Sequence, residues 1–338
     1  MIDLRSDTVT KPTREMLEFM MAARVGDMVF DEDPMVNELE EMAAAMFGME
    51  DAIYCPSGTM TNQIAIKAHT RPGDEVICSR MSHIYQFEGG GVAFNSGASV
   101  ALIDSDNGTF TTDDVKEHIN NPNDWHKAFT RLVEVENTVN RGAGACWDFE
   151  ELKKIRELCN SHNLGYHLDG ARLFNAMVAD GRKPAEYGAL FDSISICLSK
   201  GLGAPVGSLL LGNRDLIRQG ERIRKVFGGA MRQAGYIAAA GIYALRNNVA
   251  RLADDHTNAG LIAVALRECR FVEKIYYGGT NIVIFTLVPG IKASEFLEKL
   301  RGHGILALKT GERSIRIVTH LDVSDAGIKK VCEVVANL

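Results

Sequence analysis

Cysteine is scarce in this sequence: its 338 residues include seven cysteines, an odd number, and no pair has the Cys-x-x-Cys spacing. Most stand in apolar runs, which predicts reduced thiols with a structural role. The nine histidines include no His-Glu-x-x-His motif, and no group of histidines and cysteines has the spacing of a zinc site. The sequence therefore predicts neither a disulfide framework nor a bound metal.

Long hydrophobic runs and basic runs are also missing. No apolar segment approaches the roughly 20 residues that span a bilayer, and the residues from Met1 to Asp7 lack the basic and apolar regions of a signal peptide. With 37 basic and 44 acidic residues the net charge is -7, and no Lys/Arg cluster is suited to following a phosphate backbone. These absences predict a cytoplasmic protein that binds neither membranes nor nucleic acids.

Short apolar runs alternate with helical patterns over most of the chain, which is typical of a mainly parallel sheet covered by helices. One helix is predicted after the capping residue Asp33, with Pro34 in its first turn and an end at Gly48. Another should begin with a capping-box pattern, Asp148 and Glu151. Seven strands are predicted: Asp51 to Cys55, Glu75 to Ser79, Ala98 to Ile103, Arg131 to Glu136, Tyr166 to Asp169, Ser193 to Leu198 and Val206 to Leu211.

The last third of the chain changes character. A helical pattern runs from Gly229 to about Cys269 with an interruption near Asn247, and the residues beyond it predict a smaller α+β unit. Within that unit, Asn281 to Val288 and Ser314 to Thr319 alternate like strands. We expect a large α/β domain over residues 1–250, with an extended N-terminal arm, and a small C-terminal domain over residues 251–338.

The most informative stretch runs from Ser195 to Gly207, where an apolar strand pattern ends in Ser199-Lys200-Gly201. Open α/β sheets bind ligands beyond the carboxyl ends of their strands, and Lys200 stands at such an end among small residues. A dinucleotide-binding loop does not fit, because the glycines run Gly-x-Gly-x-x-x-Gly and a strand pattern follows. A lysine that merely reaches from a strand end to water is the remaining alternative.

A second charged residue, Asp169, ends the short apolar run that begins at Gly165. If the two strands are neighbours, Asp169 and Lys200 lie at the same edge of the sheet. This pair suits pyridoxal phosphate, because an amine can form a Schiff base with its aldehyde while a carboxylate keeps the pyridine nitrogen protonated, making the ring an electron sink. The sequence thus predicts pyridoxal 5'-phosphate bound through a Schiff base to Lys200.

Further short motifs extend over nearly the whole chain, and their order and spacing are specific when taken together. They are Leu4-Arg5-Ser6-Asp7-Thr8, Asp33-Pro34, Pro56-Ser57-Gly58-Thr59, Ser82-His83-Ile84-Tyr85, Glu136-Asn137-Thr138, His167-Leu168-Asp169-Gly170-Ala171-Arg172, Leu198-Ser199-Lys200-Gly201, Gly229-Ala230-Met231-Arg232-Gln233 and Arg316-Ile317-Val318-Thr319-His320. With these residues the chain resembles the low-specificity L-threonine aldolases. These are pyridoxal-phosphate lyases with the aspartate-aminotransferase fold, or fold type I.

The resemblance implies a binding site for the cofactor phosphate. Ser57, Gly58 and Thr59 occupy a strand-to-helix turn, where helix amides can bind phosphate, and an ordinary turn is the alternative. Arg232 should add positive charge from a neighbouring subunit, with an exposed helix arginine as the alternative. The family therefore also implies a homo-oligomer, a dimer or a tetramer built as a dimer of dimers, with sites that combine two chains.

Two histidines are candidates for the catalytic base. By resemblance, His83 should stack on the pyridine ring close enough to the substrate hydroxyl to exchange its proton, although a structural histidine is common at such a position. His126 matches a second histidine of the family that acts as a base directly or through water. Its loop setting leaves simple solvent exposure as the alternative.

Arginine is expected to bind the α-carboxylate of an amino-acid substrate, because its planar group donates two parallel hydrogen bonds. Arg316 is the best candidate, since it stands in a β-branched run where an unpartnered charge would be costly. Arg313 is the alternative. By resemblance, Ser6 and Arg172 complete the grip, and Arg172 also lies near the phenolic oxygen of the cofactor.

Three positions depart from the family pattern. Phe30 stands where many relatives have tyrosine, Asp31 where glycine is common, and Val139 where histidine often follows Glu-Asn-Thr. The first removes a phenolic hydroxyl expected near the substrate pocket, which affects the predicted side-chain preference. The residues expected to bind the cofactor are all present.

The implied activity is retro-aldol cleavage of L-threonine or L-allo-threonine to glycine and acetaldehyde, and of other β-hydroxy-α-amino acids to glycine and the matching aldehyde. A β-eliminating lyase or an aminotransferase on the same fold is one alternative. A homologue that binds the cofactor without catalysis is another. Elimination would release ammonia and a keto acid, and transamination would require an acceptor.

Overall fold

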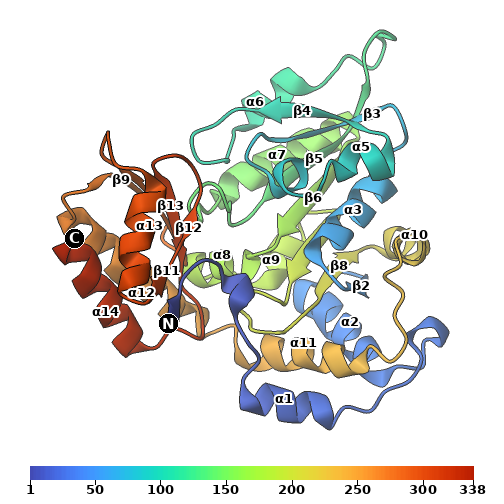
Figure 1. Cartoon of the computed structure of the whole chain (residues 1–338). Helices are drawn as coiled ribbons and strands as arrows, with labels where there is room; N and C mark the ends of the chain where they lie inside the picture. The colour runs from blue at the N-terminus through green and yellow to red at the C-terminus, as the bar shows by residue number, and fades with distance from the viewer.

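A seven-stranded sheet forms the centre of the computed structural model, which describes residues 1–338 (Figure 1). Its strands are β2 (Asp51–Cys55), β3 (Asp74–Ser79), β4 (Ser99–Ile103), β5 (Phe129–Glu136), β6 (Gly165–Gly170), β7 (Ser193–Cys197) and β8 (Ser208–Gly212). The order across the sheet is β2-β8-β7-β6-β5-β3-β4, and only β8 runs antiparallel to its two neighbours. All seven predicted strands are present, and the prediction of a mainly parallel sheet is confirmed.

Helices cover both faces of this sheet, as the alternating side chains of β8 show. Leu210 packs in one cluster with Ile64 of α3, whereas Leu209 and Leu211 belong to the main cluster with Phe47 of α2. The helices of this part are α1 (Arg14–Met21), α2 (Pro34–Phe47), α3 (Gly58–His69), α4 (His83–Gln86), α5 (Gly91–Ser96), α6 (Thr112–His118), α7 (Phe149–His162), α8 (Leu173–Asp180), α9 (Pro184–Gly188), α10 (Arg214–Val226) and α11 (Gly235–Asn247).

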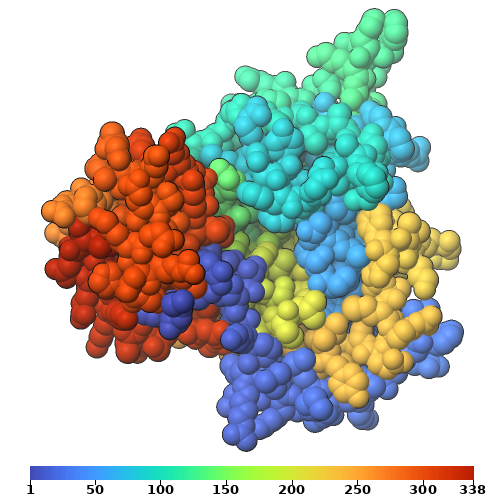
Figure 2. Space-filling view, in the orientation of Figure 1, coloured from blue at the N-terminus to red at the C-terminus, as the bar shows by residue number.

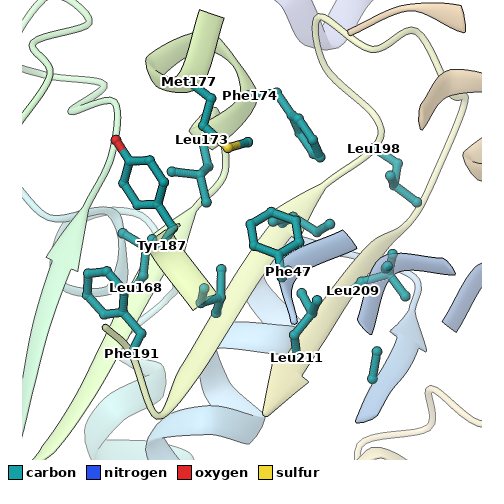
Figure 3. Close-up of a cluster of buried hydrophobic side chains, with 14 of the residues drawn as sticks. Phe47, Leu168, Leu173, Phe174, Met177, Tyr187, Phe191, Leu198, Leu209 and Leu211 are labelled. Carbon is teal, nitrogen blue, oxygen red and sulfur yellow. The ribbon is translucent and has the colours of Figure 1, made fainter. Parts of the chain in front are cut away.

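The main hydrophobic core contains 46 buried residues and lies between the sheet and helices α2, α8 and α11. Figure 3 shows part of it, where Phe47 faces leucines of the strands and Phe174 of α8. The Phe47 and Phe174 rings meet edge to face with centroids 6.0 Å apart. This packing fixes the sheet whose carboxyl-end edge carries the polar residues described below.

The predicted cap of α2 is confirmed in detail. The Asp33 side chain accepts hydrogen bonds from the Met35 and Val36 amides, and Pro34 occupies the first turn. Gly48 ends the helix at a φ of 64°, a left-handed conformation that glycine adopts without steric cost.

The cap of α7 differs from its prediction. Asp148 caps the helix by accepting from the Glu150 amide, but Glu151 does not reach back to complete a capping box. Its Oε1 instead accepts from the amide and hydroxyl of Thr112, at 2.7 Å each, which ties α7 to the start of α6. A tertiary contact has replaced the local one.

The C-terminal region builds a second sheet, with the order β12-β13-β10-β9. Its elements are α12 (Leu252–Glu268), β9 (Val272–Tyr277), β10 (Ile282–Leu287), α13 (Ala293–Gly302), β11 (Ile305–Leu306), β12 (Leu308–Lys309), β13 (Ser314–Val318) and α14 (Asp325–Asn337). The sequence predicted β10 and β13 but not β9, β11 or β12. No residue of β9 is buried. A strand without a buried face needs no alternation of apolar and polar residues, and the sequence of β9, Val-Glu-Lys-Ile-Tyr-Tyr, shows none.

The N-terminal arm belongs structurally to this second region. Strand β1 (Ile2–Asp3) pairs with β11 in parallel, and Leu4 is fully buried in a C-terminal core of 19 residues. A short 3-10 helix, Asp7–Val9, then turns the chain towards the large sheet. In the space-filling view the blue arm lies against the red C-terminal region (Figure 2). None of the helices combines the length and apolarity needed to cross a membrane.

Candidate active site

The site lies at the carboxyl-end edge of the large sheet, where β6 and β7 end side by side. These strands are parallel neighbours, with Asp169 in register with Ser195, so the predicted adjacency of the two strand ends is confirmed. Asp169 and Lys200 line one cavity of about 190 Å³ together with the turn at Ser57 and Gly58. The amine, the carboxylate and the helix N-terminus expected for a pyridoxal-phosphate site therefore converge.

The turn before α3 forms a cradle that only glycine allows. Ser57 caps the helix, its hydroxyl accepting from the Met60 amide at 3.2 Å, and the first amides of the helix lack helical partners. A Cβ at Gly58 would stand 2.5 Å from the Cys197 sulfur. Backbone amides without a side chain above them suit a phosphate, so the residues present fit the phosphate of the cofactor.

Asp169 is buried and held by two donors. The Asn62 amide nitrogen donates to one of its oxygens at 2.7 Å, and the Ala171 backbone amide donates to the other at 3.0 Å. Asn62 is itself fixed by His167 Nε2, which lies 3.2 Å from its oxygen. A carboxylate oriented in this way can face a pyridine nitrogen. Sequence reasoning missed Asn62 because its link to Asp169 spans 107 residues.

His83 is joined to the same network through Glu88, a residue that the sequence reading missed. Its Nδ1 lies 2.9 Å from Glu88 Oε1, which also accepts from the Asn62 amide nitrogen. Burial alone would lower the pKa of His83, but the hydrogen bond to Glu88 and the charge of Asp169 raise it above its ordinary value. Glu88 thus orients His83, which lines both cavities, and leaves Nε2 free of hydrogen bonds within the chain.

His83, Glu88 and Asp169 also lie close enough together to be considered as metal ligands. One ligand atom from each falls within 4.8 Å of the others. The Asn62 amide nitrogen, however, donates to both carboxylates and so stands where a shared cation would be. The three side chains are better explained as part of a hydrogen-bonded network that holds Asp169 and His83, the two residues expected to contact the pyridine ring.

Two buried glutamates at the end of β5 support the loops around the site. Glu136 accepts from the backbone amides of His83 and Asn140, both at 3.0 Å. Burial and the charge of Asp169 raise its pKa to about 7. Glu134 accepts from the Ser82 hydroxyl at 2.8 Å, and burial raises its pKa well above the ordinary value. The sequence motif marked Glu136 without revealing this supporting role.

A second, larger cavity of about 570 Å³ opens beside Lys200 and His83. Ser6 from the N-terminal arm and Arg316 from β13 also line it, so the cavity combines residues of both regions. Arg316 donates to Asn140 at 2.7 Å and to the Arg5 carbonyl at 3.2 Å, while its Nε is buried without a partner. Burial lowers its pKa to about 10, which leaves it charged at neutral pH.

Arg172 lines the larger cavity, but its guanidinium is already partly used. Its Nε and Nη2 donate to the two oxygens of Asp7, both at 2.7 Å. Burial would raise the pKa of Asp7, but the charge of Arg172 outweighs this and lowers it to about 2. The ion pair with Asp7 therefore uses Nε and Nη2 of Arg172, and Nη1 is the nitrogen left to meet a ligand.

Two predicted site residues lie elsewhere in this chain. His126 is in the exposed segment between α6 and β5 that projects at the top of Figure 1, where its ring stacks on Trp125 at 3.7 Å. Arg232 forms an ion pair with Asp27 at 3.0 Å. Neither lines the two cavities of the site.

The departures from the family pattern also lie away from the two cavities. Phe30 is 67% exposed, and Asp31 follows it in a left-handed conformation with φ of 57°. Val139 is buried and bridges to Ala145. Phe30 lines neither cavity of its own chain, so its effect on the substrate pocket stays a prediction.

The fold and the paired strand ends are those of a fold-type-I, pyridoxal-phosphate-dependent enzyme, and comparisons with known proteins identify it as a lyase. Residues 3–286 match the family model described as beta-eliminating lyase. The chain is 46% identical to the low specificity L-threonine aldolase of Escherichia coli K12 over 98% of its length and 97% of that protein. It is 39% identical to a probable low-specificity L-threonine aldolase of Arabidopsis thaliana, over 98% and 95% of the two chains.

Solved structures extend this likeness to the fold. A threonine aldolase structure from Leishmania major matches with a TM-score of 0.86 and 20% identity, covering 100% of this chain and 99% of that one. The chain belongs to the beta-eliminating lyase family and, within it, to the low-specificity L-threonine aldolases.

Proposed function

We propose that this chain cleaves L-threonine, L-allo-threonine and other β-hydroxy-α-amino acids to glycine and an aldehyde. The observation that carries the proposal is the convergence of Lys200, Asp169 and the Gly58 cradle at one edge of the sheet. Glycine and acetaldehyde released from the four stereoisomers of threonine would test it. Ammonia with a keto acid in their place would indicate β-elimination and contradict the proposal.

The small cavity is proposed to hold pyridoxal phosphate. Ser57, Gly58 and Thr59 would bind its phosphate, Asp169 its pyridine nitrogen, and Lys200 its aldehyde carbon. The bound cofactor supplies an electron sink that accepts the pair left when a bond to Cα breaks. Asn62 donates to the Asp169 carboxylate at 2.7 Å and would keep it oriented towards the pyridine nitrogen.

The larger cavity is proposed to bind the substrate. Arg316 would bind the α-carboxylate, with the Ser6 hydroxyl and Nη1 of Arg172 beside it. Holding the carboxylate there would fix the orientation of the substrate about Cα, and so would select the Cα–Cβ bond for cleavage. His83 Nε2 would take the proton of the β-hydroxyl as that bond breaks.

The role of His126 depends on a neighbouring chain, because the residue does not reach the cavities of its own chain. Arg232 also lies outside the cavities of its own chain, so it could bind the phosphate only in a neighbouring chain. We therefore assign His83 as the base within one chain, and both other residues only to an assembled site.

Substituting Arg316→Lys is expected to lower kcat/KM for L-threonine about tenfold to a hundredfold. A lysine keeps one charge but loses the planar fork, which weakens a bidentate contact by roughly 1.5 to 3 kcal/mol. Cofactor content should barely change, since Arg316 lines only the larger cavity. Cleavage kinetics and bound pyridoxal phosphate would be measured side by side.

Arg313→Lys offers a matched control. Arg313 pairs with Glu273 at 2.8 Å and donates to the Leu287 carbonyl, outside both cavities. Arg313→Lys should therefore keep the kcat/KM for L-threonine and the cofactor content of the unsubstituted chain. Unchanged efficiency in Arg316→Lys, or loss of cofactor as its main defect, would contradict the assignment.

We further propose that the active protein is a homo-oligomer, a dimer or a tetramer. The exposed aromatic residues Phe30, Phe94 and Trp125, at 67%, 90% and 85% exposure, support this proposal. Light scattering at assay concentration should therefore show no active monomer. A fully active monomer would overturn the proposal.

Two broader expectations stay proposals. The division into domains at about residue 250 is supported by the separate C-terminal core of 19 residues, to which α12 contributes Ala259 and Ile262. A cytoplasmic location stays a prediction.

A further inference from the structure

Positive charge dominates the larger cavity, and no acidic side chain lines it. Three of its cations already have assignments: Arg172 pairs with Asp7, Lys200 serves the cofactor and Arg316 the α-carboxylate. Arg141 and Lys309 remain, and neither forms an ion pair with a carboxylate of the chain. Both side chains are exposed, so their charges face the open side of the cavity.

The loop that carries Arg141 is held firmly in place. The Val139 amide donates to the Ala145 carbonyl and the Gly144 amide to the Val139 carbonyl, both at 2.9 Å. Thr280 anchors the loop to the C-terminal region by donating to the Gly144 carbonyl, also at 2.9 Å. The backbone that carries Arg141 is therefore positioned in advance, so binding an anion has to order only the side chain.

Arg141 lies close to the substrate-binding groups. Its guanidinium carbon is 5.9 Å from the centre of the Phe87 ring, which lines the same cavity. Its charge also adds to burial and to Arg172 in lowering the pKa of Arg316. Two like charges that line one cavity favour a ligand that carries a negative group for each.

Lys309 is fixed from the other side by a tight hairpin. It pairs with Ile315 of β13, and the Thr310 amide donates to the Ser314 carbonyl at 2.9 Å. Thr310 and Ser314 line the cavity beside it, and their hydroxyls bond to each other at 2.9 Å, which leaves one hydroxyl proton to donate to an anion. At about 570 Å³ the cavity also has far more room than the two-carbon side chain of threonine requires.

We propose that Arg141 and Lys309 form a second anion subsite, and that the chain prefers β-hydroxy-α-amino acids whose β-substituent carries a carboxylate. This inference rests on the proposed retro-aldol activity and names its substrate class. With 3-hydroxyaspartate, the Cα–Cβ bond would break, the β-hydroxyl would lose its proton and become an aldehyde, and Cα would regain a proton. The products are glycine and glyoxylate, so no oxidant or reductant is needed.

The test compares L-3-hydroxyaspartate with L-3-hydroxyasparagine of the same β configuration, which differ in charge and hardly in shape. Glycine release should give a kcat/KM about fivefold to tenfold higher for the charged substrate, as expected for two exposed ion pairs. In the double variant Arg141→Gln, Lys309→Gln this ratio should fall to about one. Lys329→Gln, an exposed lysine of α14 outside the cavity, should leave the ratio unchanged.

L-Threonine cleavage by the same preparation separates the two proposals. If threonine yields no glycine and acetaldehyde, the proposed function itself fails. If threonine is cleaved but the two hydroxy-amino acids react equally well, only the anion subsite is refuted. If the double variant still shows a higher kcat/KM for L-3-hydroxyaspartate than for L-3-hydroxyasparagine, Arg141 and Lys309 are not the source of the preference.

Discussion

Replacing Lys200 with alanine is expected to abolish cleavage of L-threonine, with a loss of at least about 10³-fold in kcat. Lys200 is the only lysine lining the small cavity, and Asp169 and the Gly58 turn line it as well. Its amine donates one hydrogen bond, to the Cys197 sulfur at 3.4 Å, and forms no ion pair that its removal would break. The fold should therefore survive the loss of the amine.

Three measurements separate a chemical defect from a structural one. Circular dichroism should show an unchanged fold, the absorbance of bound pyridoxal phosphate should change, and turnover should vanish. Lys329→Ala, on the exposed face of α14, removes an equivalent amine and should alter none of them. Near-normal turnover in Lys200→Ala would remove this lysine from its role.

Lys200 and Asp169 could be predicted from sequence because each is a local signal. Each stands at or just beyond the end of an apolar strand, and parallel strands bring their carboxyl ends to one edge. The alternation of strands and helices made their strands neighbours in the fold. The strand-to-helix turn at Ser57 and Gly58 is also visible locally, but only the family resemblance distinguished it from an ordinary turn.

The supporting contacts could not be found in this way. Asp7 meets Arg172 across 165 residues, and Asn281 meets Asp7 across 274. No sequence periodicity connects these positions. The contacts form only because the N-terminal arm places Asp7 between the large sheet and the C-terminal region. Glu88 is only five residues from His83, yet its contact needs the chain beyond α4 to turn back. Such pairs follow from tertiary packing rather than from local pattern.

The strands of the C-terminal sheet show a similar limit. β10 and β13 were predictable because each has one buried face, whereas β9 and β12 have no buried residues. A strand at a sheet edge can be half exposed on both faces, so its side chains carry no alternation. Lys309 lies on one of these edges, and its place in the cavity was correspondingly invisible in the sequence.

Asp169→Asn should lower kcat for L-threonine by about 10²- to 10³-fold, the usual cost of losing one charge-stabilising group in an active site. Asparagine has nearly the same shape and keeps an oxygen that can accept from Asn62 or from the Ala171 amide. It cannot, however, hold a pyridine nitrogen in its protonated form, so the electron sink is weakened. Cofactor binding should be largely retained, since the phosphate turn is unchanged.

The pH profile provides a second readout for Asp169→Asn. The charge of Asp169 helps to raise the pKa of His83, so its removal should lower that pKa. A base must be deprotonated to act, and the acidic limb of the profile should therefore move to lower pH. Asp148→Asn is the matched control, because asparagine caps a helix as well as aspartate does and Asp148 lies outside both cavities. Full activity with an unshifted profile in Asp169→Asn would show that the carboxylate neither supports the ring nor acts on His83.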